Sequence, residues 1–185
     1  NAQGGSEFIV HPPVGKWLIA IGIKIFGFHE FGWRASAAFI GALSVSLVFL
    51  FARSLFQSDL AGHLAAALTL LDGMHLVMSR TGLLDIFLMF FTLLAAYAIF
   101  IRKHWLAAIS LGLATATKWS GLYYIVAFAA WALYLDYQSE KAIDNLTPIK
   151  STATAWLPLR FLQYGLIAPL TYVLSWLGWF LTGNG

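Results

Sequence analysis

The chain has 185 residues, of which 60% are apolar and only 10% are charged. An ordinary soluble domain carries roughly 25% charged residues, so a water-exposed surface is hard to build from this composition. The net charge is only +3, and no run of Lys and Arg occurs, which excludes a nucleic-acid-binding surface. Cysteine is absent, which excludes a disulfide framework and thiolate metal sites.

The apolar residues occur in long blocks, without the alternation or heptad pattern of a soluble core. A helix that crosses a bilayer needs roughly 20 predominantly apolar residues. Segments 31–56, 60–78, 83–101 and 161–180 meet this requirement, and Pro169 is expected to kink the last of them. The sequence therefore predicts an all-α integral membrane protein, a multispanning helix bundle.

Residues 105–135 form a further apolar segment, interrupted at Lys118. A lysine in the middle of one span would be costly, whereas a turn places it at a membrane face. We therefore predict two short helices with Lys118 recessed between their ends. The first would rise only about 20 Å, less than a hydrocarbon core of about 30 Å.

The remaining segments are too short or too polar to span. Residues 17–26, flanked by Lys16 and Lys24, predict a helix that lies in the membrane interface. Charges and Pro148 predict a hydrophilic loop at residues 136–150. The glycosylation sequon at Asn145 is interpreted as chance, because Pro148 follows it and the loop is expected in the cytoplasm. Both ends of the chain resemble cuts through loops, so we expect a fragment of a longer protein.

Ionisable residues near membrane-spanning helices usually face a cavity or the interior of the bundle. Asp85 is predicted to begin a helix, where the helix dipole favours a carboxylate, and its alternative role is a helix cap paired with Arg80. Arg34 lies about one turn inside a predicted helix, and Lys118 lies between two helix ends. Either cation has an alternative role as an interfacial anchor.

Asp72, His75 and Ser79 are spaced to share one helix face within segment 60–78. An Asp and a His three residues apart can ligate a metal, but no further ligand follows nearby. We therefore expect no metal, and interpret these residues as a hydrogen-bonded stripe that lines a cavity. His11 precedes two prolines, which either present its side chain in a set direction or form a rigid loop entry.

Four motifs in one order across most of the chain carry a specific resemblance. They are FIVHPPVGKW at 8–17, FGWR at 31–34, SRTGLLDIFLMFF at 79–91 and ATKWSGLY at 116–123. Together they resemble the protein O-mannosyltransferases, and the bacterial branch, as in actinobacteria, is the most similar.

The resemblance implies a multispanning glycosyltransferase of the lipid-donor (GT-C type) architecture. Such an enzyme transfers mannose, with inversion, from a polyprenyl (dolichyl-type) phosphate to Ser or Thr of a secreted or membrane protein. It implies a multi-pass protein of the plasma membrane with an extracytoplasmic active face, contact with membrane lipid, and the export translocon as a further partner. It requires no cofactor, because the lipid-linked sugar is a substrate.

The resemblance also implies an organisation along the chain. Residues 1–30 would end the first extracytoplasmic loop and include the interfacial helix. Residues 31–135 would be the transmembrane donor-binding module, residues 136–160 a cytoplasmic loop, and residues 161–185 a further transmembrane helix.

The resemblance assigns roles to residues of this chain. Arg34, Lys118 and Arg80 would bind the donor phosphate, and Asp85 and His11 would shape the sugar and acceptor pocket. We expect the pocket to be lined further by Pro12, Pro13, Lys16, Trp119, Asp72 and His75. The family's Asp-Glu pair, which supplies the catalytic base, would lie upstream of Asn1, so these residues alone are expected to be inactive.

Three alternatives remain from the sequence. One is a related lipid-linked glycosyltransferase that modifies a glycolipid. Another is a non-catalytic membrane subunit that retains only the donor-binding half. The third is a transporter or channel, which would predict inverted repeats, and no internal repeat is visible in this chain.

Overall fold

The computed structural model describes residues 10–143 and 146–181, and within them every regular element is a helix. This confirms the all-α prediction. The helices are α1 (Pro13–Phe26), α2 (Glu30–Phe56), α3 (Asp59–Leu71), α4 (Gly73–Arg80), α5 (Asp85–Phe100), α6 (His104–Thr117), α7 (Gly121–Ala142), α8 (Pro148–Ser151), α9 (Leu157–Arg160), α10 (Ala168–Ser175) and α11 (Leu177–Leu181). Two π-helical segments, η1 (Thr152–Trp156) and η2 (Phe161–Ile167), join α8 to α9 and α9 to α10.

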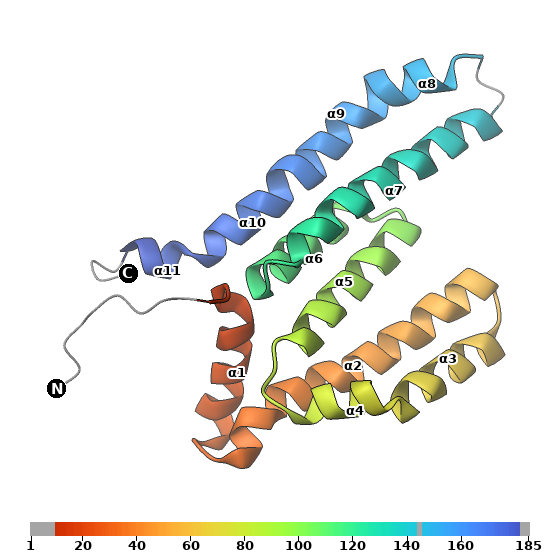
Figure 1. Cartoon of the computed structure of the whole chain (residues 1–185). Helices are drawn as coiled ribbons and strands as arrows, with labels where there is room; N and C mark the ends of the chain where they lie inside the picture. The colour runs from red at the N-terminus through yellow and green to blue at the C-terminus, as the bar shows by residue number, and fades with distance from the viewer. Residues whose placement is uncertain (1–9, 144–145, 182–185) are drawn as a thin grey trace.

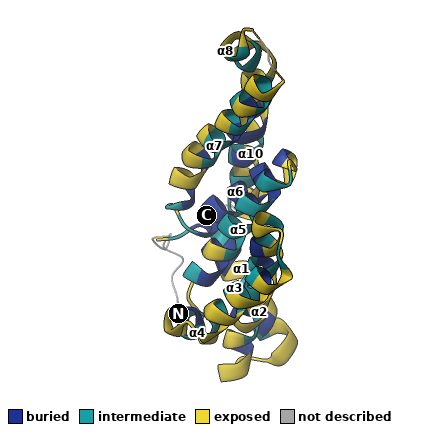
Figure 2. Ribbon diagram, turned by 90° about the vertical axis from the view of Figure 1, so that its right-hand side faces the viewer, coloured by how far each residue is buried: buried dark blue, intermediate teal, exposed yellow. Residues whose placement is uncertain are grey.

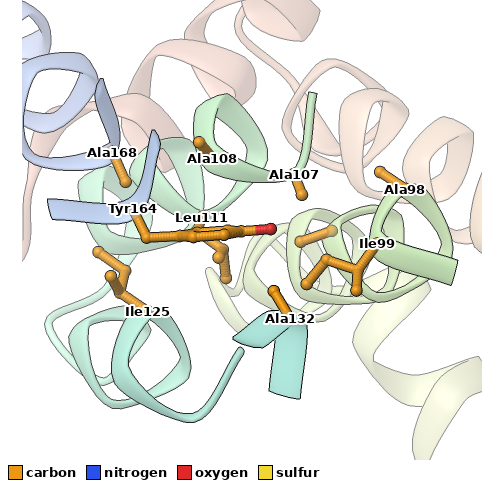
Figure 3. Close-up of a cluster of buried hydrophobic side chains, with 10 residues drawn as sticks. Ala98, Ile99, Ala107, Ala108, Leu111, Ile125, Ala132, Tyr164 and Ala168 are labelled. Atoms are coloured by element: carbon orange, nitrogen blue, oxygen red, sulfur yellow. The ribbon is translucent and has the colours of Figure 1, made fainter. Parts of the chain in front are cut away.

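The helices pack in two connected groups (Figure 1). Helices α1 to α4 form one group, and α5, α6, α7 and the α8–α10 segment form the other. A core rich in alanine lies in the second group (Figure 3), with Ala98, Ala107, Ala108 and Leu111 fully buried. Small side chains let helix backbones approach closely, which favours helix association where lipid removes the usual hydrophobic drive.

Helix α2 confirms the helix predicted at 31–56. Its 27 residues make it the one described helix that is long and apolar enough by itself to cross a membrane. Only 28% of its most apolar window is buried, so it differs from the core helix of a soluble protein. Exposed residues along the outer faces of the helices (Figure 2) include Phe39, Leu43 and Leu50 of α2.

The segment predicted as one helix at 60–78 is instead two helices, α3 and α4, bent by 63°. The break lies at Asp72, whose backbone is extended and whose carboxylate accepts a 2.7 Å hydrogen bond from the His75 N–H. An Asp at this position satisfies a donor at the start of α4 and so stabilises a new helix there. The pair is apolar enough to span a membrane only if both helices act together.

The break predicted within 105–135 is confirmed, because α6 ends at Thr117 and α7 begins at Gly121. The second helix is longer than predicted, since its 22 residues extend to Ala142. Helix α5, at 16 residues, is shorter than the predicted segment 83–101. Its connection to α6 is short, and Arg102 closes it with a left-handed backbone (φ 61°).

The predicted loop at 136–160 is wrong. Helix α7 continues to Ala142, and helical turns resume at Pro148, the first residue of α8. Two acidic residues of this segment have partners: Asp136 binds Arg160, and Glu140 accepts a hydrogen bond from Trp156. These contacts make helical structure favourable where composition indicated a solvated loop. Asn145 of the sequon lies outside the described residues, as do Phe8 and Ile9 of the first motif.

The helix expected at 161–180 differs in its regularity. The backbone stays helical at Ile167 and Ala168, immediately before Pro169, and residues 161–167 adopt wider π turns. Pro169 has no N–H to donate to the preceding turn, and the wider π turns lie just before it. A break follows at Trp176, before α11. Helix α1 begins at Pro13, earlier than the predicted residue 17, because proline suits the first helical position.

Candidate functional site

Asp85 and Lys118 form an ion pair where α5 begins and α6 ends. Lys118 Nζ donates to Asp85 Oδ1 at 2.7 Å. Asp85 is the first residue of α5, and Lys118, with an extended backbone, is the residue that terminates α6. The alternative pairing of Asp85 with Arg80 is not observed among the described residues.

The pair is only partly buried, with side-chain exposures of 32% for Lys118 and 44% for Asp85. Ion pairs of this kind typically contribute at most about 1 kcal/mol to stability, because water competes for both charges. The contact therefore orients the two side chains but contributes little to the stability of the fold. A negatively charged ligand can replace the carboxylate at Lys118.

Two cavities meet at Asp85. The larger, of about 560 Å³, lies between α3, α4 and α5 and is lined also by Asp72 and His75. The smaller, of about 330 Å³, extends along α5 toward Tyr124 and Phe128 of α7. Both have mostly apolar walls, which include Met89 in each case. Asp85 is thus a carboxylate at the junction of two apolar cavities.

His75 is 7% exposed, and its Nδ1 has no hydrogen-bond partner among the described residues. Both backbone polar groups of His75 are hydrogen-bonded to side chains. The N–H donates to Asp72, and the carbonyl accepts from Ser79 Oγ at 2.7 Å. The predicted stripe is therefore a capped helix start, because Asp72 precedes α4 and does not share a helix face with His75. Both residues nevertheless line the same cavity.

Helix α1 lies against this end of the bundle. A Cβ atom on Gly15 would lie 2.6 Å from the Leu84 side chain and 3.1 Å from that of Thr117, so α1 closely approaches the residues beside Asp85 and Lys118. Pro12 is buried, Pro13 is the first residue of α1, and Lys16 is exposed.

His11 is half-buried, and its Nδ1 has no partner among residues 10–143 and 146–181. A nitrogen shielded from water in this way can donate to or accept from a ligand. His11 thus lies just before the helix that approaches the ion pair.

The other predicted site residues are not joined to the pair. Arg34, near the start of α2, and Arg80, the last residue of α4, are exposed and make no ion pair with a described residue. The carbonyl of Trp33 approaches Gly82, so the start of α2 lies near the connection that leads to Asp85. Trp119 is exposed, and its ring centroid lies 5.5 Å from that of Tyr172.

Sequence reasoning missed a second polar cluster at the other ends of α5 and α6. Asp136 and Arg160 are buried there, and His104 Nδ1 lies 2.8 Å from the Tyr164 hydroxyl. The four-residue spacing of Arg160, Tyr164 and Ala168 was a sequence signal, because it places them on one helix face. The structure shows that all three are buried.

The chain matches known proteins over almost its whole length. Residues 10–179 match the family described as dolichyl-phosphate-mannose-protein mannosyltransferase. Proteins named polyprenol-phosphate-mannose–protein mannosyltransferase are similar to it in Mycobacterium tuberculosis (35% identity, 95% of this chain), Mycolicibacterium smegmatis (34%, 95%) and Corynebacterium glutamicum (33%, 97%). The chain spans about 40% of the length of each of these relatives. No solved structure matches it significantly. This chain belongs to the dolichyl-phosphate-mannose-protein mannosyltransferase family.

Proposed function

We propose that the complete protein carrying this sequence transfers mannose from a polyprenyl-phosphate donor to Ser or Thr hydroxyls of an exported protein, with inversion. The family and the names of its relatives support the donor and the protein acceptor. The structural observation that supports it most is the contact between Lys118 and Asp85 at the junction of two apolar cavities. Such a place suits a ligand with both a phosphate and an apolar chain.

In this proposal Lys118 binds the donor phosphate. An ammonium group is a compact point charge that exchanges a partly exposed carboxylate for a phosphate oxygen with little structural change. The leaving group is a lipid phosphate, which needs a cation to stabilise its charge and does not need an acid. Arg34 and Arg80, exposed near the same end of the bundle, are proposed to contact the same phosphate.

Asp85 is proposed to orient the sugar and the acceptor. When phosphate takes its place at Lys118, the carboxylate is released to accept hydrogen bonds from hydroxyl groups in the adjoining cavities. His75, with an unpartnered Nδ1, and His11 are proposed to add polar contacts to this pocket. Pro12, Pro13, Lys16 and Trp119 are proposed to complete its lining.

The transfer itself also needs a general base for the acceptor hydroxyl. The acceptor oxygen attacks the anomeric carbon opposite the phosphate, the bond from that carbon to the phosphate oxygen breaks, and the hydroxyl proton goes to a carboxylate. We propose that this base precedes Asn1 in the complete protein. The chemistry requires no cofactor, and none is proposed.

We propose a multi-pass architecture in the plasma membrane with the Asp85–Lys118 end outside the cell. Exposed apolar side chains on α2 and α3 support contact with lipid. Residues 31–135 would be the donor-binding module, residues 161–185 would add a further span, and α1 would lie in the interface. The starts of α5 and α7 lie toward one end of the molecule, and the label of α8 lies toward the other (Figure 1), which supports placing residues 136–160 on the cytoplasmic side.

The proposal is tested by following radiolabelled mannose from polyprenyl-phosphate-mannose in the complete protein. A peptide containing Ser or Thr should be labelled, whereas a glycolipid acceptor should not. Transfer should be lost in Asp85→Ala and Lys118→Ala and retained in Lys141→Ala, an exposed lysine at the end of α7. Labelling of glycolipid alone would assign the enzyme to the other acceptor class, and unchanged rates in the two site variants would reject these residue roles.

A further inference from the structure

The second polar cluster is built around one buried carboxylate. Asp136 accepts hydrogen bonds from Arg160 Nε at 2.7 Å and Arg160 Nη2 at 2.8 Å, and the two side chains are 1% and 4% exposed. Arg102 adds a longer contact of 3.3 Å to the same carboxylate. This cluster lies at the end of α5 and the start of α6, whereas Asp85 and Lys118 lie at their other ends.

A cavity of about 790 Å³ opens beside this cluster. Its lining includes Arg102, Lys103 and Arg160 but only one carboxylate, that of Asp136. Arg102 is half-exposed, and Lys103 is exposed and makes no ion pair with a described residue. Glu140 accepts a hydrogen bond from Trp156, which lines the cavity, at 2.8 Å and adds a second negative charge beside it, so three cations face two carboxylates. The cavity therefore has an excess of positive charge and attracts an anion.

His104 presents a buried ring nitrogen, Nε2, beside the same cavity. It lines the cavity, is 4% exposed, and has no partner for Nε2 among the described residues, while Nδ1 is engaged by Tyr164. A neutral imidazole can donate or accept at this nitrogen, so a ligand here would satisfy it.

An apolar groove of about 290 Å³ starts at the same arginine. Arg160 lines it, together with Val126 and Ala129 of α7 and Phe161 and Gly165 of η2. The groove thus runs between α7 and η2, away from the polar cluster and along apolar side chains. A positively charged cavity that adjoins an apolar groove matches a molecule with an anionic head and a hydrocarbon tail.

We propose that this end of the protein binds an anionic phospholipid of the cytoplasmic leaflet. The phosphate would contact Arg102, Lys103 and His104, and one acyl chain would lie in the groove beside Val126. Basic pockets between membrane helices on the cytoplasmic side recognise such headgroups, and tryptophans, here Trp105 and Trp156 beside the cavity, favour the interface. The proposal rests on the membrane placement proposed above, but not on mannosyl transfer.

Native mass spectrometry of the complete protein in a neutral detergent tests this site. Phosphatidylglycerol should bind more tightly than phosphatidylcholine with the same acyl chains, and Arg102→Gln with Lys103→Gln should weaken its binding by about tenfold or more. Lys141→Gln with Lys150→Gln, which removes two exposed charges that do not line the cavity, is the matched control. Equal binding of the two lipids, or equal losses in the two double variants, would overturn the proposal.

The groove is tested separately. Val126→Phe should weaken phosphatidylglycerol binding, whereas Val173→Phe, at an exposed valine outside the groove, should not. Soluble glycerol phosphate should bind far more weakly than the lipid, and equal binding would assign the cavity to a free phosphate ester and overturn the lipid assignment. Mannosyl transfer measured on the same samples keeps the two proposals apart, because either result can fail while the other holds.

Discussion

Asp85 and Lys118 are 33 positions apart in the chain, and their side chains meet at 2.7 Å. The contact depends on α5 and α6 packing as an antiparallel pair, which brings the start of one to the end of the other. It places a carboxylate and an ammonium group beside two apolar cavities. Their exposure leaves them accessible to a charged ligand.

Replacing Lys118 should affect activity far more than stability. Lys118→Met removes the cation proposed for the leaving phosphate, so kcat/KM for mannosyl transfer should fall by about 100-fold or more. The partly exposed ion pair contributes only about 1 kcal/mol at most, so the melting temperature in detergent should change little. Lys118→Arg, which keeps the charge, should recover part of the activity. A Lys118→Met protein that melts far below the parent would indicate a structural role instead.

Asp72 combines a helix cap with a place in the cavity, and two substitutions separate these roles. Asp72→Ser retains a cap for the His75 N–H, so stability should be close to that of the parent. Asp72→Ala removes the cap and should cost about 1 kcal/mol. If the carboxylate also contacts substrate, both variants should raise KM. Equal stability of the two variants, measured by thermal unfolding, would contradict the capping role.

The buried pair between Asp136 and Arg160 should be far more important for stability than an exposed one. Arg160→Leu leaves the Asp136 carboxylate buried with only the longer Arg102 contact and should destabilise the fold by about 3–5 kcal/mol. The matched comparison is Arg53→Leu, which breaks a 2.6 Å pair with Asp59 whose partners are 54% and 69% exposed. Its cost should stay below about 1 kcal/mol. Similar unfolding midpoints for the two variants would show that burial does not control the strength of these pairs.

Gly112 should tolerate no larger side chain. A Cβ there would lie 2.5 Å from Thr171 Cβ and 2.6 Å from the Ala168 carbonyl oxygen, so α6 and α10 would have to separate. Gly112→Val should destabilise the protein by about 1–3 kcal/mol. Gly73→Ala is the control, because no atom lies within 4 Å of a Cβ at that position. Unfolding measurements that rank the two variants equally would argue against close α6–α10 packing.

Much of the helix pattern could be predicted from local sequence. The long helix at 31–56 follows from an uninterrupted apolar block, and the turn before Gly121 follows from the cost of placing Lys118 inside a span. Segment 60–78 was harder to predict, because composition does not reveal that Asp72 will cap a second helix. The loop predicted at 136–160 is wrong, because Asp136 and Glu140 pair with Arg160 and Trp156, which lie 24 and 16 positions further along the chain.

The sequence by itself determined an apolar, all-helical chain, the places where polar residues interrupt it, and four motifs typical of one family. These features depend on composition, length and short spacings, which are local. Only the tertiary structure decided that Lys118 meets Asp85, and that Asp136 is buried against Arg160, 24 positions away. Such contacts depend on which helix ends pack together, and no local pattern specifies the partner of a charge.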